Sequence, residues 1–326
     1  MRMIALAEEL IVRGHRVAFF GRTDVAWVEA QLAQRALALH DPGQDFSAQA
    51  AAWGADAVVI DGYEIPRETG ESTRRRGIPV LALVDAGFGT HQDADLYLDQ
   101  NLGASRPDHL EGRWIGGERY ALLRDVVRER RGIVRPAAVE VPRALIVFGG
   151  SDPLGGAPVA AQVLLEAGVP VDVVAVAATS DIVERLRALP MRAPRQTMTV
   201  TGPVDDLPAL AITCDLAVSA AGSSVWELAC LGIPTALVEV VDNQRLGYEA
   251  AAGRLCLGLG RLAQLRDDAA QRAEASAQVR RLLAEKQYRA VMAERARRLI
   301  DGDGRVRVAD EIERLGRARR LAGRMP

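Results

Sequence analysis

The chain is almost without lysine, has few aromatic residues and contains no long apolar run. Of its 41 basic residues only Lys286 is a lysine, and no Gly-x-x-x-x-Gly-Lys phosphate loop is present. No stretch approaches the roughly 18 consecutive apolar residues of a membrane span. The first residues also lack the apolar core and cleavage site of a secretory signal. We therefore expect a cytoplasmic protein without a membrane span.

Net charge and cysteine content argue against a nucleic-acid-binding protein and against a cysteine metal site. The formal net charge is −2, which argues against a general nucleic-acid binder. The three cysteines, Cys214, Cys230 and Cys256, show no paired spacing of the kind that binds a metal. An odd number of cysteines without a secretory signal is typical of reduced, buried thiols. We expect no metal ion and no cofactor beyond a substrate.

Apolar strand patterns alternate with helical patterns along most of the chain, in two series. This alternation predicts an α/β fold with parallel sheets and right-handed crossovers. We predict a first domain over residues 1–140, a second over 141–260, a linker over 128–141 and a helical C-terminal extension over 261–326. The strands are predicted at 16–20, 57–61, 79–85 and 96–99, then at 144–148, 171–177, 197–201, 216–219 and 235–238.

The first domain begins with a helical pattern over residues 2–13 instead of a strand. In a doubly wound sheet of order 3-2-1-4-5 the first strand is central. Without it, either a gap of about 10 Å remains between the flanking strands or those strands pair directly. A gap leaves buried backbone groups unpaired, which is costly. The sequence leaves both arrangements open.

Two glycine- and serine-containing turns follow strands of the second domain. Gly149, Gly150 and Ser151 follow the first of them; they form either a loop that approaches a ligand or a tight turn capped by Asp152. The second turn precedes a helix that starts near Ser223. Helix N-terminal amides suit a phosphate. The residues of this second turn are Ala221, Gly222, Ser223 and Ser224.

Three polar residues extend this second candidate site. Glu227 lies about one helical turn, or roughly 6 Å, beyond Ser223, where a carboxylate can accept hydrogen bonds from both hydroxyls of a ribose. A helix cap with an exposed Glu227 is the alternative. Asn243 and Gln244 follow the next strand, where amides either bind sugar hydroxyls or cap a helix. A diphosphate beside a ribose would be a nucleotide-sized ligand.

The first domain has its own polar residues at predicted strand ends. Asp61, Tyr63 and His91 are the candidates for acid–base chemistry, with Asp85 nearby. Tyr63 is equally consistent with a surface turn. Ligands of open α/β sheets bind beyond the carboxyl ends of the strands, which is where these residues fall.

The ordered series of motifs resembles the nucleotide-sugar hydrolases of pseudaminic acid biosynthesis (the PseG family) and their spore-coat polysaccharide relatives. That family is a branch of the GT-B glycosyltransferases and is similar to MurG. The resemblance spans about residues 1–260. It rests on Asp61-Gly62-Tyr63 and on residues 85–91, 98–101, 117–124, 148–153, 220–227 and 243–244.

The resemblance implies two Rossmann-like domains that face a cleft and a UDP held by the second domain. It places the diphosphate at residues 222–224, the ribose at Glu227 and the sugar at Asn243 and Gln244. The loop 149–151 would lie by the phosphates across the cleft, and Tyr63 matches a tyrosine near the reacting sugar. Family members usually need no metal.

One departure from the family affects the expected chemistry. The family opens with a strand and a loop ending in Gly-His-x-x-Arg, whose histidine is the acid/base; here Met1 to Ala7 match the helix after that loop. Either the sequence starts inside that region or the base has been lost.

We expect an enzyme that releases UDP from a UDP-amino-sugar by hydrolysis. The alternatives are a glycosyltransferase with an acceptor, in glycan or natural-product synthesis, and an impaired nucleotide-sugar-binding protein.

Overall fold

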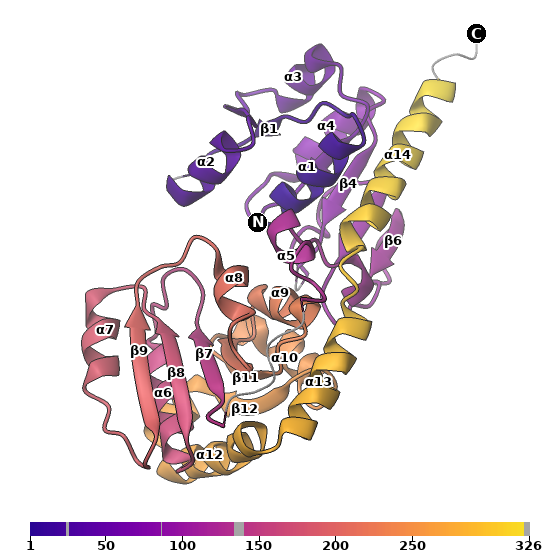
Figure 1. The fold of residues 1–326 in the computed structure, drawn as a ribbon. Coiled ribbons are helices and arrows are strands. Elements are labelled where there is room, and N and C mark those ends of the chain that lie inside the picture. Colours follow the sequence, from indigo (N-terminus) through magenta and orange to yellow (C-terminus); the bar gives the residue numbers. More distant parts are fainter. Residues whose placement is uncertain (24–25, 86, 134–139, 323–326) are drawn as a thin grey trace. The chain divides into compact units, whose positions relative to one another are not determined.

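The computed structural model describes residues 1–23, 26–85, 87–133 and 140–322. The chain divides into two compact units (Figure 1). The first comprises Met1–Asp125 with Gly302–Pro326, and the second comprises Val126–Asp301. Residues 134–139 of the predicted linker lie outside the described residues.

The first unit contains a four-stranded parallel sheet of order β3-β4-β5-β6 and a separate parallel pair, β1-β2. The chain order alternates helix and strand, as the sequence predicts. The elements are α1 (Arg2–Val12), β1 (Phe19–Phe20), α2 (Ala26–Ala33), β2 (Leu39–His40), α3 (Phe46–Trp53), β3 (Val58–Ile60), α4 (Arg67–Arg75), β4 (Val80–Leu83), β5 (Leu96–Asp99), β6 (Arg113–Gly116), η1 (Glu118–Tyr120), α5 (Asp125–Arg128), which reaches into the second unit, and α14 (Gly304–Ala322).

Both faces of the four-stranded sheet are buried, which is typical of parallel strands. Successive residues of β4 serve opposite faces: Leu81 packs in one apolar cluster and Val80 in the other. Helices α1 and α14 cover the first face, with Ala5 and Val308 in contact with the strands. Residues of α3 and its surroundings cover the second face.

The strands of the first unit form two separate sheets. β1 pairs only with β2, and β3 is the edge strand of the larger sheet. Of the two arrangements that the sequence left open, direct pairing of the flanking strands is therefore not the one adopted. The open edge of each sheet keeps backbone groups unpaired by a neighbouring strand.

The second unit contains a six-stranded parallel sheet of order β12-β11-β10-β7-β8-β9. The first strand of this unit, β7, lies inside the sheet (Figure 1). Its elements are β7 (Arg143–Val147), α6 (Gly156–Glu166), β8 (Val171–Val176), α7 (Ser180–Arg187), β9 (Gln196–Thr201), α8 (Leu207–Ala211), β10 (Leu216–Ala220), α9 (Ser224–Leu231), β11 (Thr235–Glu239), η2 (Asp242–Gln244), α10 (Arg245–Ala251), β12 (Leu257–Arg261), α11 (Leu262–Asp267), α12 (Ala269–Ala284) and α13 (Lys286–Leu299).

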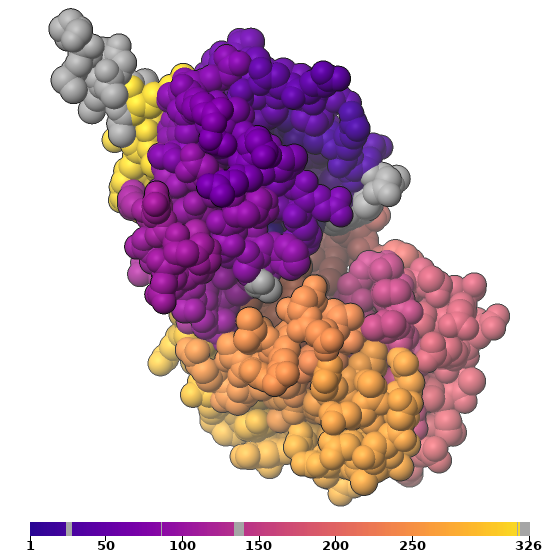
Figure 2. Space-filling view, turned by 180° about the vertical axis from the view of Figure 1, so that it is seen from behind, coloured from indigo at the N-terminus to yellow at the C-terminus, as the bar shows by residue number. Residues whose placement is uncertain are grey.

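The C-terminal helices do not form the separate extension over 261–326 that the sequence suggested. Helices α11, α12 and α13 belong to the second unit, where Leu265, Val279 and Met292 enter the core. Figure 2 shows the orange and gold segments, which include α12, as a continuous outer layer of that unit. Helix α14 belongs to the first unit. The sequence shows that these helices have apolar positions but not which core receives them.

Two further expectations concern burial. The thiols of Cys214, Cys230 and Cys256 are buried, as predicted. Among the described residues, no helix is both long and apolar enough to cross a bilayer.

Buried charges fix α14 to the first unit. The guanidinium of Arg305, only 2% exposed, lies 3.0 Å from Glu8 and 3.2 Å from Glu9 of α1, and it also pairs with Asp125. Near the other end of α1, Arg13 donates to Asp310 of α14 over 2.7 Å. A segment almost 300 residues away in the chain therefore closes one face of the first sheet.

We expect Arg305→Ala to lower the free energy of unfolding of the first unit by about 3–5 kcal/mol, because it removes the buried cation that pairs with Glu8, Glu9 and Asp125. Arg317→Ala is the matched control. Its partner Glu313 lies one turn away on the exposed side of the same helix, so its loss should cost under about 0.5 kcal/mol. Urea unfolding followed by the fluorescence of Trp53 and Trp114 measures both. Equal effects of the two substitutions would contradict the anchoring role of Arg305.

Candidate functional site

Three adjacent strands of the first unit deliver polar side chains to one edge of the sheet. Asp61 follows β3, Asp85 lies just beyond β4, and Asn101 follows β5. Because parallel strands end at the same edge, these residues meet there. Arg2, in the first turn of α1, lies among them. We call Arg2, Asp61, Tyr63, Asp85 and Asn101 the Arg2 cluster.

Arg2 bridges the two carboxylates of this cluster. Its Nη2 donates to Asp61 Oδ1 over 2.6 Å, its Nε reaches Asp61 Oδ2 over 3.0 Å, and its Nη1 donates to Asp85 Oδ2 over 3.1 Å. Burial alone would lower the pKa of Arg2, but the hydrogen bonds and charges of Asp61 and Asp85 outweigh it and raise that pKa. The guanidinium therefore stays charged and is shared between the two acids.

Tyr63 is the exposed member of the cluster. Its hydroxyl donates to Asp85 Oδ2 over 3.0 Å, and its ring meets Phe88 edge-on with centroids 4.7 Å apart. Half of the tyrosine is exposed, at 54%. Burial of the rest, with the neighbouring Asp85 carboxylate, raises the pKa of Tyr63. The hydroxyl is a neutral hydrogen-bonding group at physiological pH.

The turn that carries Phe88 requires a glycine. Gly89 has φ of +86°, and a Cβ there would lie 1.9 Å from the Leu83 carbonyl oxygen. Asp85 and Phe88 exchange backbone hydrogen bonds of 3.0 and 2.9 Å across this turn. The turn thus holds the Phe88 ring against Tyr63.

Asn101 is the fifth member of the Arg2 cluster and contacts Asp85. Its Nδ2 donates to Asp85 Oδ1 over 3.1 Å, and its backbone amide donates to Asp99 Oδ1 over 2.9 Å. Burial raises the pKa of Asp99. Both oxygens of Asp85 consequently have donors, from Asn101 on one side and from Tyr63 and Arg2 on the other.

His91 lies away from these contacts. Its Nε2 is 2.8 Å from the Ile65 carbonyl oxygen and 3.1 Å from the side-chain nitrogen of Gln92. The structure therefore brings Asp61 and Tyr63 together around Arg2 and Asp85, and holds the exposed His91 against a neighbouring loop. An acid–base role for His91 stays a prediction.

Metal ligands were not expected in this region. Arg74 pairs with both Asp93 and Asp95, the acidic residues that follow His91. In the described part of the chain, no three His, Cys, Asp or Glu side chains are grouped as metal ligands would be.

The second unit places its candidate residues at the carboxyl edge of its own sheet. After β10, Ala221 donates its amide to the Val238 carbonyl over 3.0 Å, which aligns the turn with β11. Helix α9 then starts, with Ser223 as its N-cap residue and no side-chain capping bond. The amides of Ser223 and Ser224 have no carbonyl one turn earlier in the helix to bind. They are available to an anion at this helix start.

The other two residues of this edge lie close by. The side-chain amide of Gln244 lies beside the turn, because a Cβ built on Gly222 would be 3.8 Å from Gln244 Nε2. Gln244 Oε1 accepts from the Val240 amide over 3.1 Å, which fixes the side chain. Asn243 is exposed on the same short helix, η2. Trp226 of α9 is only 7% exposed and belongs to the core.

The turn at residues 149–151 is followed by the Asp152 cap that the sequence offered as one alternative. Asp152 accepts from the amides of Gly156 and Ala157 over 2.7 and 2.9 Å at the start of α6. Burial raises the pKa of Asp152. Gly149, Gly150 and Ser151 stay exposed above this cap, and Gly149 has φ of +72°. Capping by Asp152 leaves the exposed residues available to a ligand.

Three further residues at these edges, Arg2, Glu239 and Arg261, lie outside the candidate motifs of the sequence. Glu239 ends β11 with its side chain buried, and Arg261 lies 3.1 Å from it. An acid at the end of an apolar strand is a signal in the sequence, as Asp61 was. Arg2 gives no such signal, because its contacts with Asp61 and Asp85 depend on where the first turn of α1 lies on the sheet.

We expect Asp85→Asn to lower the pKa of Tyr63 toward the ordinary value of about 10, because the substitution removes the adjacent negative charge. A difference titration at 295 nm against Tyr63→Phe isolates this residue. Asp93→Asn is the matched control, since Asp93 pairs with Arg74 instead. An unchanged Tyr63 titration in Asp85→Asn would contradict the contact.

Comparison with known proteins indicates the fold. No protein-family model and no curated sequence matches the chain. Among solved structures, MurG of Acinetobacter baumannii aligns with a TM-score of 0.69 at 17% identity over 96% of this chain and 95% of that one. The glycosyltransferase VinC in complex with dTDP gives 0.62 at 18% identity, over 97% and 96%. The UDP-GlcNAc 2-epimerase of Neisseria meningitidis bound to UDP-GlcNAc gives 0.63 at 12%, over 96% of each. The chain therefore has the α/β GT-B fold, with two Rossmann-like units.

Proposed function

We propose that this protein is a nucleotide-sugar-processing enzyme that cleaves the anomeric C–O bond of a UDP-amino-sugar and releases UDP. The observation that carries the proposal is the turn from Ala221 to Ser224. It follows a buried strand and presents the uncapped start of α9, with Gln244 beside it.

Each polar group of this edge has a role in the proposal. The amides of Ser223 and Ser224 bind the diphosphate, and the absence of a side chain on Gly222 lets the phosphate approach the backbone. Glu227, one turn further on, accepts hydrogen bonds from the ribose hydroxyls. Asn243 and Gln244 bind the sugar, and the exposed loop 149–151 contacts the phosphates.

The fold likeness supports the same class of ligand. Two of the similar structures contain dTDP or UDP-GlcNAc, and the MurG and VinC structures are of glycosyltransferases. The motif series adds the resemblance to PseG-like hydrolases. The choice of UDP and of an amino sugar follows from that resemblance.

The chemistry requires two things of the protein. The departing diphosphate gains negative charge, which helix N-terminal amides stabilise. Water or an acceptor hydroxyl must lose a proton to a base. In the first unit, Tyr63, His91 and the carboxylates of Asp61 and Asp85 are the candidates, and Arg2 is shared between the two acids.

Two other functions remain as candidates, each with its own support. Transfer of the sugar to an acceptor is favoured by the likeness to MurG and VinC. A nucleotide-sugar-binding protein with little turnover is favoured by Arg2, which occupies the two carboxylates that would serve as bases. Hydrolysis stays the first proposal because the motif series matches the hydrolases.

We expect Glu227→Ala to weaken UDP binding by about 1.5–3 kcal/mol, the range for hydrogen bonds to a charged group. Titration calorimetry measures the affinity. Glu249→Ala is the control, because Glu249 is an exposed acid on α10 that pairs with Arg245 one turn away. Equal UDP affinity in wild type and Glu227→Ala would remove the ribose assignment.

Release of UDP from a panel of UDP-amino-sugars then separates the three functions. Release without an acceptor supports hydrolysis. Release only with added acceptors indicates transfer, and UDP binding without release under either condition indicates the binding protein. Absence of UDP binding would overturn the proposal as a whole.

A further inference from the structure

An arginine at the end of the edge strand β12 is bound to the segment that carries Asn243 and Gln244. The Nε of Arg261 lies 3.1 Å from Glu239 Oε1, and its Nη2 donates to Asp242. Glu239 is the last residue of β11, and Asp242 is the first residue of η2. One guanidinium therefore connects the ends of two neighbouring strands with the start of η2. We call Glu239, Asp242 and Arg261 the Arg261 clamp.

A bulge in β12 brings Arg261 opposite Glu239. The two strands pair in parallel, and their register shifts by one residue after Leu237. In an unshifted register Gly260 would be opposite Glu239; beyond the shift, Arg261 takes that place. Gly260 has φ of +106°, a conformation that favours glycine. The backbone of β12 is thus shaped so that the cation meets the acid.

Glu239 requires a cation at this position. Its side chain is only 6% exposed, and its Oε1 accepts no hydrogen bond from the described residues. A buried carboxylate is costly unless a charge compensates it, so the ion pair with Arg261 is held in place. The half-exposed guanidinium of Arg261 extends from this buried acid to Asp242. The buried end of the clamp fixes the arginine, and the exposed end fixes η2.

η2 in turn fixes the position of Gln244. The backbone amide of Gln244 donates to the Val241 carbonyl over 2.9 Å, and its Oε1 accepts from the Val240 amide over 3.1 Å. Its Nε2 is then left beside the turn at Gly222, 3.8 Å from where a Cβ on that glycine would lie. Because η2 has only three residues, a displacement of Asp242 at its start also displaces Gln244 at its end.

Helix α10, which follows η2, is attached to β12 at a separate point. The Gly260 amide donates to the Tyr248 hydroxyl over 2.7 Å. Gly258 permits this approach, because a Cβ there would lie 2.6 Å from the same hydroxyl oxygen. Loss of the clamp should therefore release η2 while α10 stays on the sheet.

We propose that Arg261 is a positioning residue for the sugar half of the substrate. This role rests on the proposed function, in which Asn243 and Gln244 bind the sugar and the amides of Ser223 and Ser224 bind the diphosphate. Arg261 acts through η2 and not by contact with the substrate. Its loss should weaken the binding of a nucleotide sugar more than the binding of the nucleotide alone.

Hydrogen exchange without any ligand tests the clamp itself. In Arg261→Gln we expect the amides of Val240 and Gln244 to exchange at least about fivefold faster, because η2 is released. The Ala221 amide, which donates to the Val238 carbonyl, is the internal reference and should exchange at an unchanged rate. Unchanged exchange at Val240 and Gln244 would overturn the proposal.

Arg245→Gln is the matched control for the lost charge. Arg245 lies close enough to Glu239 and Asp242 to interact with their charges, but its hydrogen bond is to Glu249 of its own helix, over 2.9 Å. The substitution removes the same charge without opening the clamp. Equal acceleration of exchange in Arg245→Gln and Arg261→Gln would overturn the proposal.

Asp242→Asn is the second test variant, and it keeps the buried pair of Glu239 and Arg261 intact. The side chain of Asp242 is 89% exposed, so the substitution should leave the fold unchanged. It removes a negative charge, whereas Arg261→Gln removes a positive one. Release of η2 predicts the same effect from both, and effects of opposite sign would overturn the proposal.

Calorimetric titration with UDP and with UDP-GlcNAc measures the consequence for binding. We expect the ratio of UDP-GlcNAc affinity to UDP affinity to fall at least about fivefold in Arg261→Gln and in Asp242→Asn, the scale of one lost hydrogen bond. The ratio should stay unchanged in Arg245→Gln. Normal UDP binding with an unchanged ratio in Arg261→Gln would overturn the role of Arg261 alone. Failure of the wild type to bind either ligand would overturn the proposed function and, with it, the sugar-positioning role.

Discussion

Parallel strands end at a common edge, and the candidate chemistry of both units depends on this constraint. In the first unit it gathers Asp61, Asp85 and Asn101 from three strands that are far apart in the sequence. In the second it places the start of α9 beside Gln244, which follows β11. Burial of both sheet faces leaves the carboxyl edges as the places where polar side chains emerge from the strands.

The sequence predicts the strands best where they are apolar on both faces. The runs at 79–85, 171–177 and 216–219 correspond to β4, β8 and β10. β2 has two exposed residues, and β12 contains two glycines, so neither gives an apolar run. Asp61 and Tyr63 could be predicted as neighbours because they follow one buried strand. Arg2 could not, since its partners become visible only when α1 is placed on the sheet.

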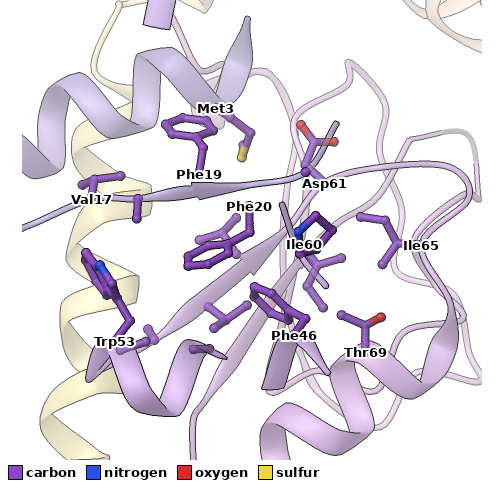
Figure 3. A pocket seen from close by; sticks show the side chains of 18 of the residues that line it. Met3, Val17, Phe19, Phe20, Phe46, Trp53, Ile60, Asp61, Ile65 and Thr69 are labelled. Atoms are coloured by element: carbon purple, nitrogen blue, oxygen red, sulfur yellow. The ribbon is translucent and has the colours of Figure 1, made fainter. Parts of the chain in front are cut away.

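The two units differ chiefly in one strand. In the second, β7 pairs on both sides and carries the core between α6 and the sheet. In the first, the corresponding layer is a cavity of about 640 Å³, and the apolar residues of α1 and α3 face each other across it (Figure 3). The first unit is nevertheless closed on one face by α14, whose Arg305 is bound to α1 and to Asp125.

In the first unit, the position of α1 also affects the groups that could accept a proton, because Arg2 contacts them. The residue that starts α1 is also the one that pairs with Asp61 and Asp85, so the placement of α1 and the availability of a base are coupled. The oxygens of both carboxylates already accept hydrogen bonds from Arg2, Tyr63 or Asn101. The helix start at Ser223 depends on none of these contacts. In the proposed enzyme, nucleotide binding and proton transfer are therefore separable properties, and the arrangement around Arg2 governs the second.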